Sequence, residues 1–538
     1  MTSKTYRNYI KSAQTKEART FDVIIIGSGT GGMSAASFLA QAGKRVLLLE
    51  QHYVLGGFTH TFERSGYIWD VGLHYVGQVH IEGSVLNKVF RYIAKDKLKW
   101  EPLDNIYDRA IFGDEEYQFP RGRDNLKAKL KAYFPEEKDR ISIDQYFSLL
   151  DDAQNLGSGY YLEKTLPPML SKIVGNFLRR STLKVSDKTT LAALKEITDN
   201  VKLIGVLTAQ YGDYGLTPAK SSFYMHALLA NHYMEGAAYP VGGAAKIAEC
   251  IIPIINESEG IALTLANVDE IIVEDNTATG VRMKDGEALY AKTIISAAGI
   301  TNTYSHLLPE KVSKGHKLDK LLDELEPATA HVGLYVGLKE SSTSLALKKC
   351  NYWIYPNQYD HDKGREEYKD FNATIPVSFV SFPSAKDPLA EKRRPDRSTA
   401  EVIMLVPYEW FTQWENTKWQ KRDDEYKALK EKLAQQMLEQ LYRIAPQLKG
   451  KIDYYEVSTP LSTRHFSQHK QGEIYGLAHS PKRFRQKFLR IHTPIKNLFL
   501  SGQDVMTASI AGGTMSGLLC ASTVLKENLL WTVNKAIK

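Results

Sequence analysis

The sequence predicts an α/β fold, in which a Rossmann-type dinucleotide-binding domain is interleaved with a second domain of α+β type. Three observations support this prediction. An apolar run, a glycine-rich loop and a helix follow one another after residue 20. Blocks of short strands recur far downstream, near residues 260–300 and 330–410. The 538 residues also exceed the size at which one hydrophobic core stops growing, roughly 250–300 residues, so two lobes are expected.

The first folded unit is predicted to be a βαβ motif. Residues 21–26 form a short apolar run, which is typical of a buried parallel strand, and residues 44–50 (KRVLLLE) form a second one. Between them, residues 33–42 are rich in Ala and Leu and predict a helix. Residues 1–20 are polar and basic, and we expect them to be a flexible leader.

A glycine-rich loop joins the first strand to this helix and matches the GxGxxG pattern. Gly27 permits the tight turn, Gly29 lets the backbone approach a pyrophosphate, and Gly32 lets the helix pack closely on the sheet. Glu50 ends the next strand, where it would accept hydrogen bonds from an adenosine ribose. Amides at the helix N-terminus would face the phosphates. The predicted site comprises Gly27, Ser28, Gly29, Thr30, Gly31, Gly32, Glu50 and Gln51.

Three further features favour FAD over NAD. A glycine pair follows the acid within a few residues, where FAD proteins return the chain over the pyrophosphate. A distant segment, NLFLSGQD, has the strand–Gly–Asp form that holds a ribityl chain. The strand-rich block after residue 260 would supply a backbone clamp for adenine. The predicted domain is therefore of the glutathione-reductase/amine-oxidase-like kind with FAD as cofactor, and its site also includes Gly56, Gly57, Val268, Gly502 and Asp504.

No second GxGxxG accompanies this motif. An external reductant such as NAD(P)H would therefore use a site of another kind, or electrons would come from a redox partner.

The rest of the chain alternates helical and strand-rich blocks. Residues 86–230 are charged and helical with few strand signals, and a further helix is expected over residues 423–446. We therefore expect a leader and two interleaved domains: residues 1–20 as leader, 21–85, 235–310 and 490–538 as the FAD-binding domain, and 86–234 and 311–489 as the substrate and membrane-facing domain.

Composition limits the partners and the location. The net charge of +7 and the pI near 8.8 suit an anionic membrane surface, and no basic patch interleaved with aromatics indicates nucleic-acid binding. Three distant cysteines form no CxxC pair, so neither a disulfide framework nor a metal site is expected. The N-terminus lacks an apolar signal region, and no run of about 18 apolar residues occurs. We expect a cytoplasmic protein that is peripheral to the membrane and not secreted.

The segment from Leu166 to Val185 (LPPMLSKIVGNFLRRSTLKV) predicts an amphipathic helix. Its apolar residues recur at helical spacing, with Lys172, Arg179 and Arg180 on other faces, as in helices that lie on anionic lipid. A core-facing amphipathic helix has the same pattern, so both interpretations stay open.

Several longer stretches resemble one family of flavoproteins, which contains the phytoene desaturases, carotenoid isomerases and retinol saturases. The resemblance runs from about residue 21 to 530 and is nearest to the retinol saturase branch. It is carried by WDVGLHYVGQ (69–78), SFYMHALLANHYMEGAAYPVGGAAKIA (222–248), FVSFPSAKDP (379–388), GEIYGLAHS (472–480) and NLFLSGQDVMTASIAGGTMSGLLCASTVL (497–525).

The resemblance implies FAD, a lipophilic conjugated polyene as substrate, and redox chemistry at a carbon–carbon double bond. Two departures qualify it. Animal retinol saturases carry an N-terminal membrane-targeting segment that we do not expect here. Amine oxidases and many desaturases place Arg after the glycine pair, where this chain has Phe58.

Saturating an alkene requires a hydride from reduced flavin and a proton from a side chain nearby. The candidates are His74, Tyr75, Asp213 and His226, and the alternative for each is a buried polar residue with its hydrogen bonds satisfied. Saturation of a retinoid- or carotenoid-like double bond is the leading prediction. A desaturase or a cis–trans isomerase is the alternative, and a non-redox lipid-binding chaperone on a GDI-like fold is the more remote one.

Overall fold

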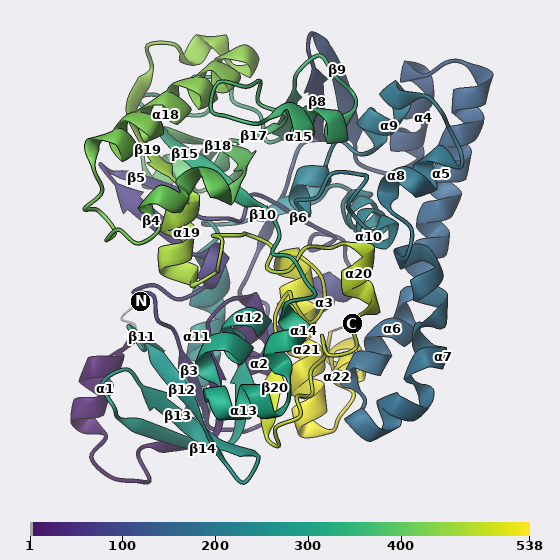
Figure 1. Cartoon of the computed structure of the whole chain (residues 1–538). Helices are drawn as coiled ribbons and strands as arrows, with labels where there is room; N and C mark the ends of the chain where they lie inside the picture. Colours follow the sequence, from purple (N-terminus) through teal and green to yellow (C-terminus); the bar gives the residue numbers. More distant parts are fainter. Residues whose placement is uncertain (1–3, 538) are drawn as a thin grey trace.

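The computed structural model describes residues 4–537 and has two lobes with a column of helices along one side (Figure 1). The lower lobe combines the first elements of the chain, in purple, with its last elements, in yellow, and with teal strands from the middle. The upper lobe is mainly green. Segments far apart in the sequence therefore build each lobe together.

The lower lobe contains an eight-stranded sheet with a parallel core. The central strand is β2 (Thr20–Ile26), which lies parallel to β3 (Val46–Leu49) on one side and to β14 (Ala288–Ser296) on the other. The strands predicted over residues 21–26 and 44–50 are thus confirmed. The remaining strands are β1 (Lys4–Thr5), β11 (Ile261–Thr264), β12 (Val268–Glu274), β13 (Thr277–Met283) and β20 (Leu498–Leu500).

Strand β14 connects the parallel core to the C-terminal part of the chain. It pairs antiparallel with β13, which pairs with β12 in a meander, and it also pairs in parallel with β20. Because parallel strands end at the same edge, the segment after β20 lies beside the glycine loop after β2. A Cβ built on Gly31 would lie 2.8 Å from the Cα of Gly502.

Two glycine-containing helices, α2 (Thr30–Gln41) and α21 (Ser509–Leu525), pack against each other. A Cβ on Gly513 would lie 2.3 Å from Thr30 Oγ1, and one on Gly517 would lie 2.5 Å from Ser34 Cβ. Only glycine permits this approach of the two backbones. The predicted helix over residues 33–42 is confirmed, and it begins earlier, within the glycine motif.

The described part of the expected leader is folded, which corrects that prediction. Strand β1 extends the sheet by pairing with β11, and α1 (Tyr6–Ser12) follows it. Tyr6 is buried, and its hydroxyl donates a hydrogen bond to Asp285 at 2.9 Å. Two strand residues are too few to give an alternating pattern, so the sequence carried no strand signal here.

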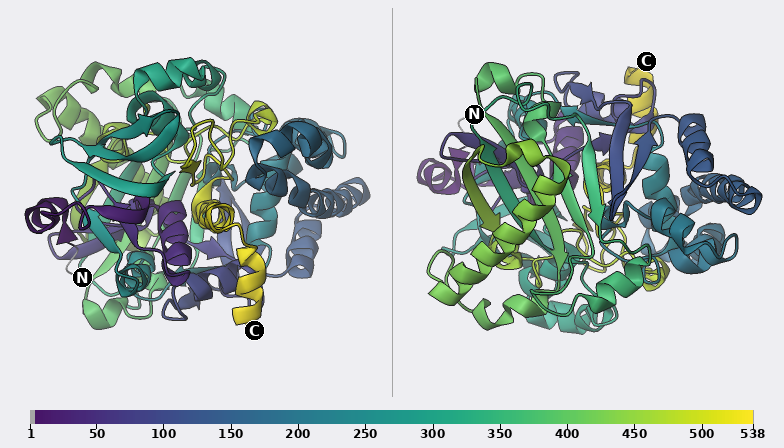
Figure 2. Two further views of the ribbon diagram at one scale, coloured as in Figure 1. Left: turned by 90° about the horizontal axis from the view of Figure 1, so that it is seen from below. Right: turned by 90° about the horizontal axis from the view of Figure 1, so that it is seen from above.

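The upper lobe contains a seven-stranded mixed sheet covered by α18 (Asp424–Ile444), which lies across the strands in the right-hand view of Figure 2. The predicted strands within 330–410 and the helix over 423–446 are confirmed. In order, the sheet contains β19 (Ile452–Ser458), β15 (Ala330–Leu338), β18 (Ser398–Val406), β17 (Ser378–Ser381), β16 (Asn351–Tyr355), β8 (Ile106–Phe112) and β9 (Glu115–Pro120).

Strands β8 and β9 fall in the block that was expected to be mainly helical. They form a hairpin that turns at Gly113, whose φ of 57° lies in the left-handed region. Most of the rest of the block is helical. Helix α3 (Val85–Ile93) packs against α2 and α21 in the lower lobe. The column at the side of both lobes comprises α4 (Arg123–Tyr133), α5 (Glu137–Asn155), α6 (Gly157–Thr165), α7 (Pro168–Ser186), α8 (Thr190–Lys195), α9 (Val201–Leu207) and α10 (Phe223–Tyr233).

Two small sheets complete the fold. The hairpin of β4 (Thr61–Arg64) and β5 (Tyr67–Asp70) packs on the upper sheet, where Trp69 Nε1 donates to the carbonyl oxygen of Val336 at 3.0 Å. The second sheet orders β6 (Val76–Gly77), β10 (Ala237–Pro240) and β7 (Trp100–Pro102). Across residues 4–537, no helix is both long enough and apolar enough to span a bilayer.

Gly32→Ala tests the close packing of α2. A Cβ at this position would lie 2.0 Å from the carbonyl oxygen of Gly27, so we expect the free energy of unfolding to fall by about 1–3 kcal/mol or more. Chemical denaturation measures the change.

Gly315→Ala is the matched control, because a Cβ there meets no atom within 4 Å. Equal stability of the two variants would contradict the packing argument.

Candidate active site

One cavity of about 920 Å³ reaches from the glycine loop of the lower lobe to the sheet of the upper lobe. Every cofactor residue predicted from the sequence lines it except Gly32, which lies behind the loop. The structure thus brings together Gly27, Ser28, Gly29, Thr30, Gly31, Glu50, Gln51, Gly56, Gly57, Val268, Gly502 and Asp504.

The glycine loop presents bare backbone to this cavity. Gly27 has a φ of 96°, and a Cβ there would lie 3.0 Å from the carbonyl oxygen of Ala297. A Cβ on Gly29 would meet nothing within 4 Å, and Gly29 is also the N-cap residue of α2. The first amides of a helix have no partner within the helix, so they are available to an anion at this position.

Glu50 lies at the end of β3 and lines the cavity, although only 8% of it is exposed. Its Oε2 accepts hydrogen bonds from the amide of Ser28 at 3.0 Å and from Ser28 Oγ at 2.6 Å. Its Oε1 accepts one from the amide of His52 at 2.9 Å. These bonds fix the carboxylate, and an oxygen with two lone pairs can still accept a bond from a ribose hydroxyl.

The C-terminal part of the site is fixed by Asp504. Its Oδ2 accepts a hydrogen bond from the amide of Ile300 at 2.9 Å, and its Oδ1 accepts one from the amide of Leu477 at 3.0 Å. Asp504 therefore holds together three segments of the cavity wall. Gly502, with a φ of 113°, has open space at its Cβ position. The glycine cradle, helix N-terminus and fixed carboxylate fit the phosphates and ribose of a dinucleotide.

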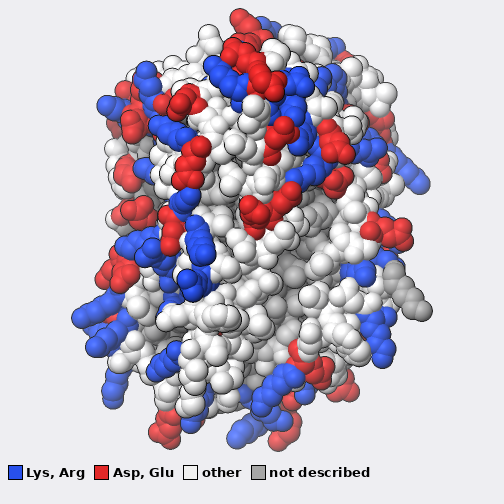
Figure 3. All heavy atoms as spheres, turned by 90° about the vertical axis from the view of Figure 1, so that its right-hand side faces the viewer, with Lys and Arg blue, Asp and Glu red and all other residues white. Residues whose placement is uncertain are grey.

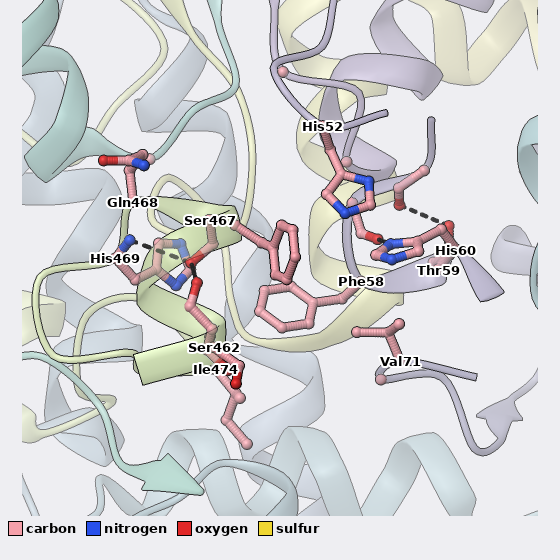
Figure 4. A pocket seen from close by; sticks show the side chains of 18 of the residues that line it. His52, Phe58, Thr59, His60, Val71, Ser462, Ser467, Gln468, His469 and Ile474 are labelled. Carbon is pink, nitrogen blue, oxygen red and sulfur yellow. Dashed lines mark hydrogen bonds between the residues drawn. The ribbon is translucent and has the colours of Figure 1, made fainter. Parts of the chain in front are cut away.

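The other end of the cavity is a mainly apolar chamber. Figure 4 shows Phe58 and Val71 on one side of the pocket, with Ser462, Ser467 and Ile474 on the other. Strands of the upper sheet contribute further aromatic and branched side chains. Among the apolar lining residues are Phe58, Phe62, Val71, Tyr335, Trp353, Val377, Phe379, Ile403, Leu405, Ile474 and Tyr475.

A pair of carboxyl groups, one buried (Asp108) and one half-buried (Asp213), borders this chamber. The Tyr75 hydroxyl lies 2.6 Å from Asp213 Oδ2 and 3.1 Å from Asp108 Oδ2. One hydroxyl has one proton to donate, so a second bond at this oxygen requires a proton on one carboxyl. Asp108 also accepts bonds from Asn351, Gln210 and Trp353, which stabilise its ionised form.

The proton of this pair therefore resides on Asp213. Burial raises the pKa of Asp213 to about 8, and the charge of Asp108 contributes in the same direction. Burial also raises the pKa of Asp108, to about 6, but its hydrogen bonds oppose the shift. Asp213 lines the cavity, whereas Asp108 and Tyr75 do not, so Asp213 is the member that can reach a bound substrate.

A second buried cluster surrounds His74, which also lines the cavity. His74 Nδ1 lies 3.0 Å from Glu401 Oε2, and Lys386 Nζ donates to the carbonyl oxygen of His74 at 3.0 Å. Burial raises the pKa of Glu401 to about 8 and lowers that of His74 to about 3. A protonated Glu401 beside a neutral imidazole is the arrangement that these shifts favour.

The structure places His226 elsewhere. Its Nε2 lies 2.9 Å from the Tyr146 hydroxyl and its Nδ1 3.3 Å from the Tyr214 hydroxyl. His226 is buried and is not among the cavity-lining residues. This environment satisfies both ring nitrogens and gives no support to a catalytic role.

Sequence reasoning missed four charged residues near the cavity: Asp70, Asp108, Lys386 and Glu401. Two of them lie in stretches that carry the family resemblance, WDVGLHYVGQ and FVSFPSAKDP. The signal that could have identified them is a charged residue within an otherwise apolar stretch, because such a residue is buried only when it has polar partners. Within residues 4–537, no cluster of His, Cys, Asp and Glu has a metal-binding arrangement.

A cavity that offers a helix N-terminus to phosphates at one end and an aromatic chamber at the other is typical of flavin-dependent oxidoreductases. The family described as flavin containing amine oxidoreductases matches residues 30–525. The chain belongs to this family, and it is an oxidoreductase with a flavin cofactor.

Relatives support the resemblance found in the motifs. All-trans-retinol 13,14-reductase of Danio rerio is 37% identical over 532 residues, and that of Homo sapiens is 36% identical over 530 residues. Each match covers 94% of this chain and 86% of the relative. Prolycopene isomerase of Arabidopsis thaliana is 25% identical over 523 residues, covering 94% of this chain and 83% of the isomerase.

Solved structures confirm the fold. An oxidoreductase from Methanosarcina mazei superposes with a TM-score of 0.61 at 16% identity, covering 94% of this chain and 100% of that one. Putrescine oxidase bound to putrescine superposes with a TM-score of 0.63 at 13% identity, covering 94% and 99%.

Gly29→Ala tests the cradle. The methyl group has open space in the fold but would occupy the cavity where a pyrophosphate approaches the backbone. We expect flavin affinity to fall by at least about tenfold, with apoprotein stability within about 0.5 kcal/mol of the parent. Flavin titration and thermal unfolding of the apoprotein measure the two quantities. Unchanged flavin affinity would show that the loop does not hold the phosphates.

Proposed function

We propose that the protein is an FAD-dependent enzyme that saturates a carbon–carbon double bond of a lipophilic, retinoid- or carotenoid-like polyene. The observation that carries the proposal is the continuity of the cavity, which joins the dinucleotide cleft to an apolar chamber. The names of the relatives from Danio rerio and Homo sapiens describe reduction of all-trans-retinol. Aromatic and branched walls suit a flat conjugated chain.

The cofactor in this proposal is FAD. The amides of residues 29–31 would hold the pyrophosphate, Glu50 the adenosine ribose, and the strand at Val268 the adenine. The backbone at Gly502 would border the ribityl chain, held in place by Asp504. When bound, reduced FAD supplies a hydride.

Asp213 is the proposed proton donor. It lines the chamber, and its raised pKa keeps it protonated at neutral pH, as a general acid must be. Tyr75 and Asp108 act as positioning residues, because their hydrogen bonds fix the carboxyl group and the location of the proton. His74 also lines the cavity in its neutral form, and its contact with Glu401 fixes the orientation of the imidazole ring.

The polyene would come from lipid, since it is nearly insoluble in water, so we propose a cytoplasmic protein that is peripheral to the membrane. We propose NAD(P)H or a redox partner as the source of electrons for the flavin.

The second candidate function is that of an isomerase or a desaturase. It is supported by the 25% identity to a prolycopene isomerase. A GDI-like carrier without redox chemistry has less support, because residues 27–31, Glu50 and the Gly56–Gly57 pair of the dinucleotide cradle all line the cavity.

Anaerobic mixing of a retinoid or carotenoid with oxidised and with dithionite-reduced protein separates these functions. For saturation, we expect only the reduced protein to convert the polyene, with one flavin reoxidised for each double bond lost. Absorbance of the flavin and of the polyene follows both reactants. Consumption by the oxidised protein would indicate a desaturase, and conversion by reduced protein without flavin oxidation an isomerase.

Asp213→Asn tests the proton donor. An amide cannot supply a proton, so we expect kcat to fall by about 10²–10⁴-fold with flavin content unchanged. In the parent, the required form is protonated, so activity should be present below pH 8 and decline as the pH rises through about 8.

Tyr75→Phe and Asp114→Asn complete this test. The Tyr75 hydrogen bond lowers the pKa of Asp213, so its removal should move the alkaline limb to higher pH. Asp114 is an exposed turn residue, and its amide variant should retain parental activity and pH dependence. Full activity of Asp213→Asn would overturn the assignment.

A further inference from the structure

The α6–α7 pair carries the largest group of exposed apolar side chains on any two consecutive helices described. On α7, Met169 is 77% exposed, Ile173 73% and Phe177 80%. These three residues are spaced four apart and therefore lie on one face of the helix. Isolated exposed apolar residues are normal, but a contiguous group marks an interaction site. The group comprises Leu162, Met169, Leu170, Ile173, Val174 and Phe177, and we call it the α7 surface.

The opposite face of α7 is buried and polar. Ser171, Gly175, Arg179, Thr182 and Ser186 all point into the protein. This polarity is the inverse of a core-facing amphipathic helix, which buries its apolar stripe. The structure thus excludes the core-facing interpretation of this segment, because its apolar face is exposed.

A buried charge network fixes α7 in this orientation. Glu163 is 1% exposed and lies 3.9 Å from Arg179 and 3.4 Å from Arg490. Arg490 also donates to Ser171 Oγ at 2.7 Å and to the carbonyl oxygen of Leu166 at 2.6 Å. Rotating α7 to bury its apolar face would leave these charges unpaired, which is strongly unfavourable. The exposure is therefore built into the fold.

Basic side chains flank the apolar group. Lys172, Arg180 and Lys184 are exposed on α7, and the helix carries no Asp or Glu between residues 168 and 186. Figure 3, which views the molecule from the side of the helical column, shows a wide area free of charge, bordered by both basic and acidic side chains. Positive charge beside apolar side chains complements a bilayer of anionic lipid.

We propose that the α7 surface docks the protein on an anionic lipid bilayer, with Met169, Ile173 and Phe177 inserted among the acyl chains and the flanking cations at the headgroups. The inference adds a partner surface to the proposed function and does not depend on the reaction at the flavin. A second copy of the chain is the competing occupant. Charge argues against it, because a two-fold pairing would bring Lys172, Arg180 and Lys184 of the two copies together.

The test is co-sedimentation of the full-length flavoprotein with vesicles of phosphatidylcholine containing about 30 mol% phosphatidylserine. We expect Ile173→Ser with Phe177→Ser to weaken binding by at least about tenfold. The matched control is Ile141→Ser, which removes an isoleucine that is 49% exposed on α5, outside the α7 surface. Lys172→Ser with Arg180→Ser and Lys184→Ser should remove the preference for phosphatidylserine over pure phosphatidylcholine.

A second measurement detects insertion into the bilayer directly, so the test does not rest on loss of vesicle binding alone. Phe177→Trp should show fluorescence quenching by vesicles with brominated acyl chains, whereas Ile141→Trp should not. Parental vesicle binding by the double serine variant would overturn the proposal. So would a dimer that the same variant converts to monomer, measured by light scattering. Flavin content and turnover of detergent-solubilised polyene should stay unchanged, so failure of docking is distinguishable from failure of the proposed function.

Discussion

The close approach of α2 to its neighbours is the constraint on which the rest of the structure depends. Gly32 lets the helix touch the backbone of Gly27, while Gly513 and Gly517 bring α21 against its other side. This contact aims the N-terminus of α2 into the cavity and fixes the end of β20 beside it. Larger residues at these positions would move the helix and therefore the predicted phosphate site.

The two lobes contribute different chemistry to one cavity. The lower lobe offers amides and a fixed carboxylate, whereas the upper sheet offers aromatic walls with charged groups behind them. Burying Asp108, Lys386 and Glu401 is costly unless they are bonded to one another or to polar partners. Lys386 bonds to Asn351 and Ser381, and Asn351 bonds in turn to Asp108. This network links the Asp213 side of the chamber to the His74 side.

The α7 surface shows that buried charges also determine structure outside the cavity lining. A helix is usually oriented by its apolar stripe, but here a buried ion network takes that role. Glu163 pairs with Arg179 of α7 and with Arg490 of the C-terminal part of the chain, and these buried ion pairs hold α7 with Ile173 and Phe177 exposed. A lipid surface would cover these side chains and relieve that exposure, which is how the chamber could be supplied with a lipophilic polyene.

The sequence by itself determined the βαβ unit, the glycine cradle, Glu50 and the strand-rich blocks, because each depends on residues close together or on a local period of polarity. It could not place Asp213 beside Tyr75 and Asp108, exclude His226 from the cavity, detect β1, or orient the helix over residues 168–186. Those features arise from contacts between segments as many as 327 residues apart, such as Arg490 with Glu163. Only the tertiary structure decided them. The periodicity of a helix shows that it has an apolar and a polar face, but not which of the two faces packs against the rest of the protein.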